Sequence, residues 1–159
     1  LCCAGETWAH TRIWNEPQQP ETWNALERLC HDILEPLAAR YGKLEITYGF
    51  ASAELFRHIP SGTAKALDQH ASCELNKKQQ PICSRLGAAV DFTVATATSR
   101  ESAIWIAENF PFDRMYFYGD DRPLHVSIGP DNKRALVDMI PLDNGRRMPR
   151  NRPLGWLKE

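Results

Sequence analysis

The sequence lacks an excess of positive charge. It has 19 lysines and arginines against 20 aspartates and glutamates, which gives a formal net charge of −1 at pH 7. A domain without a basic field does not attract a phosphate backbone. The composition therefore indicates no binding of nucleic acid.

The sequence also lacks a long apolar run. No stretch approaches the roughly 20 apolar residues that a helix needs to cross a bilayer. The opening letters "LCCAGETWAH" contain neither the basic nor the apolar region of a signal peptide. We therefore expect a soluble domain without a membrane partner.

Disulfides are not needed in a chain of this size. The 159 residues can bury a sizeable core, so we expect a single domain over residues 1–159. Five cysteines are an odd number, which favours a reducing compartment and hence the cytoplasm. Cys73 and Cys83 could be a disulfide, two free thiols or metal ligands. Because the sequence begins at Leu1, we expect a domain excised from a longer protein, whose other domains would be its partners.

Apolar periodicity predicts the elements of the first half. From Glu21 to Tyr41 the apolar residues recur on one helix face, and Gly42 ends the helix. Pro36 should bend this helix. The alternating letters "LEITYGF" predict a strand over residues 44–50, followed by a short helix over residues 52–59. Residues 60–85 are polar and weakly periodic, which predicts a long ordered loop of the kind that is often functional.

The second half alternates strands and one helix. "AAVDFTV" predicts a strand, and Thr98 with Glu101 forms a capping box that opens a helix reaching Glu108. "RMYFYG" and "PLHVSIG" predict two strands joined by a compact turn, and "RALVDMI" predicts a last strand or a short helix. Residues 144–159 form an extended, basic, proline-rich tail, from which Trp156 could dock. This order indicates an α+β fold, with a small, mainly antiparallel sheet and flanking helices.

Three polar residues stand out against this background. Asp91 and His125 each interrupt an apolar strand, and His70 lies in the long loop. Each could be a half-buried polar residue with an ordinary hydrogen-bond partner. Together, two histidines and one carboxylate that leave a fourth position open are what a catalytic zinc ion requires. The pattern predicts a zinc site on His70, Asp91 and His125.

A family resemblance rests on four stretches: "TWNALERLCHDILEPLAARYGKLEITYGFASAELF", "GAAVDF", "FDRMYFYG" and "PLHVSIG". Their order resembles the zinc D-Ala-D-Ala carboxypeptidase family, which includes phage endolysin peptidases and the related hedgehog fold. The resemblance covers roughly residues 20–130 and implies a small α+β fold with zinc in a cleft on the sheet. Asp91 matches the aspartate ligand of the family, and His125 matches its last histidine ligand.

Three departures from the family pattern concern function. The first histidine ligand should lie seven residues before Asp91, where this chain has Ser84. "DQH" resembles the motif that normally carries that ligand, which makes His70 the candidate after an insertion of "SCELNKKQQPICSR". The catalytic glutamate of the family falls on Tyr118, whose phenol cannot act as the same base at neutral pH. The arginine that steadies the substrate falls on Ala51.

The resemblance leaves two functions open. The first is a zinc hydrolase of a peptide or peptidoglycan-like substrate, in which the metal activates a water molecule. Its unorthodox base would be Asp121, Glu74 or Tyr118, and its substrate would be bound by Ser52 and by Arg122, Arg85 or Arg57. The second is a binding or structural module of a larger protein that contains zinc but does not catalyse.

Overall fold

The structure is a computed structural model that describes residues 1–60 and 64–159. The predicted long helix is confirmed: α2 (Pro20–Leu29), a π-helical turn η1 (Cys30–Leu34) and α3 (Glu35–Tyr41) follow one another without a break, and Gly42 ends α3. The irregular turn directly precedes Pro36, which has no N–H to donate to the preceding turn. A short helix that the sequence did not predict, α1 (Glu6–Thr11), precedes them. No helix of the described residues is long and apolar enough to span a membrane.

Six strands form one sheet. They are β1 (Leu44–Tyr48), β2 (Ala88–Val94), β3 (Arg114–Phe117), β4 (Leu124–Ile128), β5 (Ala135–Pro141) and β6 (Arg147–Arg152). Their order across the sheet is β1-β2-β4-β3-β5-β6. Every neighbouring pair is antiparallel except β3 and β5. The α+β class and the mainly antiparallel sheet are therefore confirmed, and "RALVDMI" is a strand.

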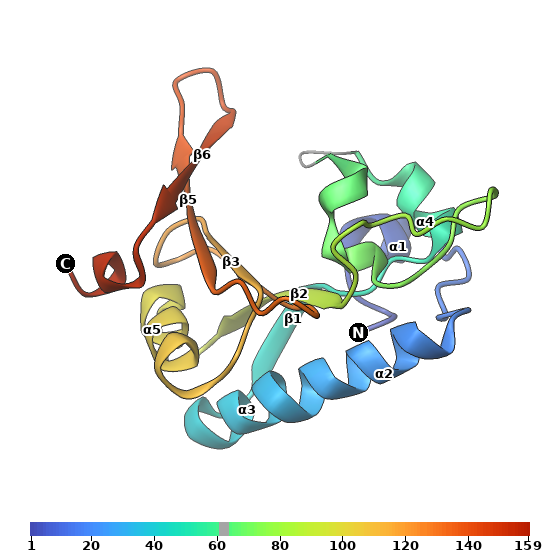
Figure 1. The fold of residues 1–159 in the computed structure, drawn as a ribbon. Coiled ribbons are helices and arrows are strands. Elements are labelled where there is room, and N and C mark those ends of the chain that lie inside the picture. Colours follow the sequence, from blue (N-terminus) through green and yellow to red (C-terminus); the bar gives the residue numbers. More distant parts are fainter. Residues whose placement is uncertain (61–63) are drawn as a thin grey trace.

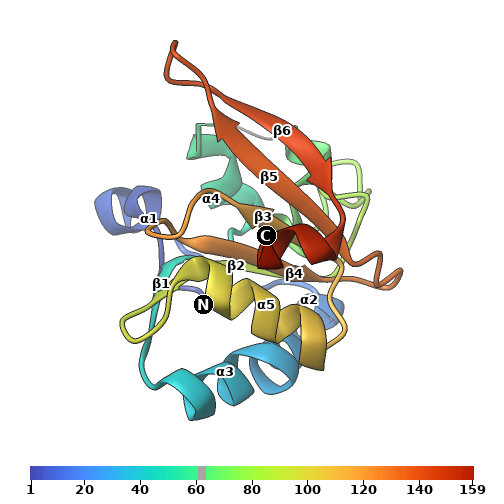
Figure 2. The ribbon, with the colours of Figure 1, turned by 90° about the vertical axis from the view of Figure 1, so that its left-hand side faces the viewer.

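The core lies between one face of the sheet and three helices. Figures 1 and 2 show α2, α3 and α5 (Ser99–Asn109) on that face. Val90 and Phe92 of β2 and Val126 of β4 are fully or almost fully buried there against Leu29 and Ile106. Because side chains alternate along a strand, the residues between them face the opposite side of the sheet. The capping box predicted at the start of α5 is present between Thr98 and Glu101.

The opposite side of the sheet is covered by α4 (Ala53–His58) and by the segment that follows it (Figure 1). The predicted long loop contains two short 3-10 turns, η2 (Lys65–Leu67) and η3 (Gln69–Ala71). Residues 61–63 of that predicted loop lie outside the described residues. The loop is closed by a bridge between Leu75 and Pro81 and by a hydrogen bond from Ile82 N to Glu74 O of 2.8 Å. All five cysteines are free thiols. Backbone hydrogen bonds, rather than a disulfide, therefore hold together the two ends of the segment of residues 74–82.

The predicted tail is extended, and it is paired as well. Its residues 147–152 form β6 along the edge of β5, and residues 154–158 form a 3-10 turn, η4 (Leu154–Lys158). Leu157 is buried, and the Trp156 ring lies edge-on to Phe117 at 5.9 Å between centroids. The letters "RMPRNR" show no apolar alternation, which explains why the strand was not predicted: β5 supplies its pairing.

Candidate metal centre

Two of the three predicted ligands are direct partners across the sheet. Asp91 of β2 and His125 of β4 are opposite each other in the antiparallel register. Tyr116 of β3 is opposite His125 on the other side, and Tyr48 of β1 is opposite Asp91 at a bulge. These four side chains therefore form a row across the face that α2, α3 and α5 do not cover.

His70 reaches this row from η3. Its neighbour Gln69 is buried and anchors the turn: the Gln69 amide donates to Leu86 O at 2.9 Å and to Ile128 O at 3.2 Å, while its oxygen accepts from Ser127 Oγ at 2.8 Å. Asp68 Oδ1 accepts from the backbone N–H of His70 at 3.0 Å and caps the turn. Asp68 and Gln69 thus hold the His70 imidazole against β2.

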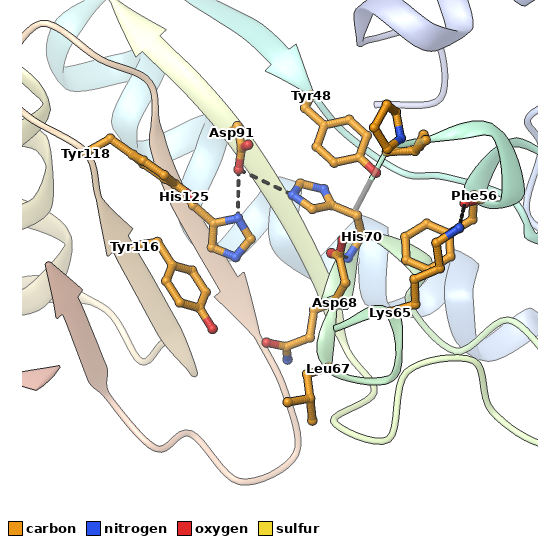
Figure 3. Close-up of a pocket in the computed structure, with 13 residues that line it drawn as sticks. Tyr48, Phe56, Lys65, Leu67, Asp68, His70, Asp91, Tyr116, Tyr118 and His125 are labelled. Carbon is orange, nitrogen blue, oxygen red and sulfur yellow. Dashed lines mark hydrogen bonds and ion pairs between the residues drawn. The ribbon is translucent and has the colours of Figure 1, made fainter. Parts of the chain in front are cut away.

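The three side chains converge on one point. His125 Nδ1 lies 2.7 Å from Asp91 Oδ1, and His70 Nε2 lies 3.3 Å from the same oxygen. Each residue offers one ligand atom, and the three atoms lie within 4.8 Å of one another. Figure 3 shows both imidazoles pointing toward the Asp91 carboxylate. This buried group can hold a metal ion.

The orientation of His70 is fixed by a backbone carbonyl. His70 Nδ1 lies 2.8 Å from Gly49 O. A carbonyl oxygen only accepts, so Nδ1 carries a hydrogen and Nε2 is the nitrogen that faces Asp91. A histidine that binds a metal through one nitrogen almost always donates from the other to a carbonyl or a carboxylate. The contact with Gly49 is of this kind.

Charge is concentrated at the centre. Burial alone would raise the pKa of the Asp91 carboxyl, but the adjacent His70 and His125 imidazoles outweigh it and lower this pKa below its usual range. Burial alone would lower the pKa of His70, but the charge of Asp91 and its hydrogen bond outweigh it and raise this pKa. In the metal-free centre the ionised Asp91 carboxylate and the charged form of the His70 imidazole therefore stabilise each other.

The three residues line a cavity of about 190 Å³ between the sheet and the α4 side (Figure 3). The ring of Tyr48 covers His70, with 3.8 Å between centroids and an interplanar angle of 31°. Tyr116 lies edge-on to His125 at 4.9 Å. Phe56 and Lys65 line the same cavity, on the His70 side (Figure 3).

Tyr118, the residue at the position of the family's glutamate, also lines this cavity. Burial and, after it, the charge of Asp91 raise the pKa of Tyr118 to about 12. Its phenol is therefore protonated at neutral pH and is able to donate a hydrogen bond. Tyr118 and Asp91 also line a neighbouring depression, together with Arg122 and Arg147. The guanidinium of Arg147 is fixed there by hydrogen bonds to Tyr118 O and Met139 O.

The structure does not bring the other candidate bases to the metal centre. Asp121 is exposed and lines a different depression beside Thr98. Glu74 is 1% exposed, and its Oε1 accepts from the backbone N–H groups of Gln18 and Gln19 at 3.0 and 3.1 Å. Glu74 therefore anchors the long loop to the chain before α2.

The candidate substrate-binding residues are also spread out. Arg85 Nη1 donates to Tyr116 Oη at 3.0 Å, which places it behind the cavity wall. Ser52 caps α4, where its Oγ accepts from Leu55 N and donates to Trp14 O. Arg122 lines the depression beside Tyr118, and Arg57 lines a groove next to α4.

Sequence reasoning missed one acidic residue of the cavity. Asp68 is, besides Asp91, the only carboxylate among the described residues that line it. A signal was present, because Asp68 stands two residues before a candidate ligand and caps the turn that carries it. Tyr48, Tyr116 and Lys65 were missed as well, since nothing in the sequence shows which side of the cavity they face.

Comparisons with protein-family models, with curated protein sequences and with solved structures find no match for this chain. The site is thus defined by its own geometry: a histidine, an aspartate and a second histidine on a sheet, inside a cavity lined by tyrosines.

Proposed function

We propose that this domain is a divergent relative of the zinc D-Ala-D-Ala carboxypeptidase family that hydrolyses a peptide or amide bond. The observation that carries the proposal is the convergence of one ligand atom each from His70, Asp91 and His125 within 4.8 Å. Two imidazoles and one carboxylate, with a fourth position left for water, are the donor set of catalytic zinc sites.

Two of the separations within the donor set support zinc in addition to its chemistry. Zinc bonds to nitrogen and oxygen are about 2.0–2.2 Å long, so tetrahedral ligand atoms lie roughly 3.3 Å apart. The separations of 2.7 and 3.3 Å from Asp91 Oδ1 are close to this value. The carbonyl of Gly49 supplies the orienting contact that metal-binding histidines need.

The candidate ligands, Asp68 and Tyr118 have distinct roles in this proposal. His70, Asp91 and His125 would hold the zinc ion, which would supply Lewis-acid chemistry: a lower pKa for a bound water molecule and a polarised carbonyl. The Asp68 carboxylate, which lines the same cavity, takes the proton from the attacking water. The neutral phenol of Tyr118 donates a hydrogen bond to the oxygen on which negative charge develops.

Metal content tests the first part of the proposal. We expect purified protein to bind one zinc ion per chain, and His70→Ala, Asp91→Ala and His125→Ala each to weaken zinc binding by at least ~100-fold, because each removes a ligand. His31→Ala is the matched control, since His31 is exposed and pairs with Glu35. Zinc titration by calorimetry and elemental analysis measure the effect. Full zinc content in all three variants would contradict the proposal.

Hydrolysis tests the second part. With peptides ending in D-Ala-D-Ala, peptidoglycan fragments and a mixed peptide library as substrates, we expect Asp68→Asn to lower kcat by at least ~100-fold while zinc stays bound. Retention of full activity in Asp68→Asn would exclude Asp68 as the base. Zinc binding without hydrolysis of any of these substrates would favour the second candidate function, a binding module, which the replacement of the family's glutamate by Tyr118 supports.

A further inference from the structure

A second concavity adjoins the metal cavity. It lies between α4 and the loop of residues 75–82, and Phe56, Leu75 and Ile82 give it apolar walls. We call it the basic groove. Figure 1 shows α4 beside this loop, on the side of the sheet away from α2 and α3. The groove is wide enough, at about 640 Å³, to receive several side chains.

The charged residues of the basic groove are all cations. Arg57 and Lys65 come from the α4 side, and Lys77 and Lys78 come from the turn of the loop. No aspartate or glutamate is among its described lining residues, and within the described part of the chain none of the four cations forms an ion pair. The whole chain has a net charge of −1, so the four cations of the groove are a local concentration of positive charge.

The loop wall of the basic groove is held by its own hydrogen bonds. Asn76 N donates to Gln80 O at 2.8 Å, and Asn76 Oδ1 accepts from the backbone N–H groups of Lys78 and Gln80. The Glu74 side chain fixes the base of the loop to the backbone before α2. The lysines therefore stand on a preorganised turn, which lowers the entropic cost of binding a ligand.

The basic groove shares a wall with the metal cavity. Phe56 and Lys65 line both concavities, and Lys65 Nζ donates to Phe56 O at 2.8 Å, which fixes the shared wall. Figure 3 shows both side chains on the His70 side of the metal centre. A ligand long enough to cross this shared wall would contact both concavities.

We propose that the basic groove binds the acidic portion of an extended peptide whose scissile bond lies at the metal centre. This assignment of substrate class rests on the proposed function. The carboxylates of such a peptide pair with the cations, while its apolar side chains pack on Phe56, Leu75 and Ile82. Charge complementarity of this kind sets specificity and register along a bound chain.

Peptide binding tests the proposal without requiring hydrolysis. The probes are a fluorescein-labelled peptide of alternating Glu and Leu and the same peptide with Lys in place of Glu. We expect the acidic peptide to bind more tightly than the basic one, and Lys77→Glu with Lys78→Glu to weaken acidic-peptide binding by about tenfold or more, because two attractive contacts become repulsive. Lys43→Glu, an exposed residue that does not line the groove, is the matched control. Fluorescence anisotropy at low and high salt measures all four affinities.

The outcomes separate this proposal from the zinc proposal. The preference for the acidic peptide should persist in His125→Ala, where the metal centre is disrupted but the groove is intact. Equal binding of both peptides, or no change on double charge reversal, would overturn the groove assignment even if zinc is bound. Tighter binding of a DNA oligonucleotide or of anionic lipid vesicles than of the acidic peptide would also overturn it. A charge-dependent peptide preference in a protein that binds no zinc would support the groove and refute the metal centre.

Discussion

At the scale of single residues, the metal centre depends on contacts that hold its imidazoles from outside. Gly49 O selects the nitrogen that His70 presents to Asp91. A side chain at Gly49 would meet Leu1 O at 2.3 Å, so this carbonyl lies in a segment with no room for a larger residue. The geometry of the candidate ligands is therefore held by neighbours that are not candidate ligands themselves.

Tyr48 and Tyr116 provide a matched pair of substitutions. In the described part of the chain the buried Tyr48 Oη has no hydrogen-bond partner, whereas Tyr116 Oη accepts from Arg85. We expect Tyr48→Phe to leave the free energy of unfolding unchanged or to raise it by about 1 kcal/mol, and Tyr116→Phe to lower it by ~0.5–1.5 kcal/mol. Urea unfolding with chelator present measures both. A larger loss in Tyr48→Phe than in Tyr116→Phe would show that the Tyr48 hydroxyl has a stabilising partner.

The sequence predicted the three candidate ligands, and the structure brings them together. Asp91 and His125 stood out because each interrupts an apolar strand, and strand alternation then places both on the polar face. The role of Glu74 could not be predicted, since only the folded loop shows that its carboxylate accepts from the Gln18 and Gln19 backbone. Asp68 was missed because its place in the cavity depends on the conformation of η3.

At the scale of elements, the glycine directly before β2 permits a close approach. Gly87 has φ +82°, and a Cβ there would lie 1.9 Å from Ile128 O at the end of β4. The antiparallel pair that aligns Asp91 with His125 starts directly after this contact.

We expect Gly87→Ala to lower the free energy of unfolding by more than ~2 kcal/mol, because it adds a backbone clash to an unfavourable φ. Zinc affinity should fall as well, since β2 and β4 carry two of the ligands. Gly145→Ala is the control: its φ is +76° but no atom lies within 4 Å of its Cβ position, so only the conformational cost of about 1 kcal/mol applies. Chemical denaturation and zinc titration measure the two effects. Similar losses in both variants would show that the contact with Ile128 is relaxed.

Elements with strong local signals were predicted, and elements formed by tertiary pairing were not. The long helix, β2 and α5 follow from apolar periodicity and the Thr98 capping box. α1 was not predicted because its six residues, ETWAHT, show no apolar periodicity, and none of them is buried in the structure. β6 is mostly exposed and polar, and its conformation comes from its hydrogen bonds to β5.

At the scale of the whole molecule, the last turn η4 closes the core. Leu157 is 1% exposed, and Arg100 packs over both Trp156 and Phe117. The far end of the chain thereby contributes to the packing of α5 against the sheet.

We expect Leu157→Ala to lower the free energy of unfolding by ~2–4 kcal/mol, because it leaves a cavity in the core. Zinc affinity should stay unchanged, since Leu157 lies on the helical side of the sheet and the ligands face the other. Lys158→Ala, an exposed neighbour that pairs with Glu108, should change the free energy of unfolding by less than ~0.5 kcal/mol. Thermal and urea unfolding compare the two variants. Equal losses would mean that η4 does not seal the core.

The polar pair Asp91 and His125 also helps to specify the register in which β2 and β4 pair. A shift of the β2 pairing register by one residue would exchange the two faces of the strand. The ionised Asp91 carboxylate would then face Leu29 and Ile106, and Val90 and Phe92 would be exposed. Burying an unpaired charge is far more costly than exposing an apolar side chain. Misregistered intermediates are thus penalised by the same residues that form the candidate metal site, so one set of side chains serves both the site and the pairing of the strands.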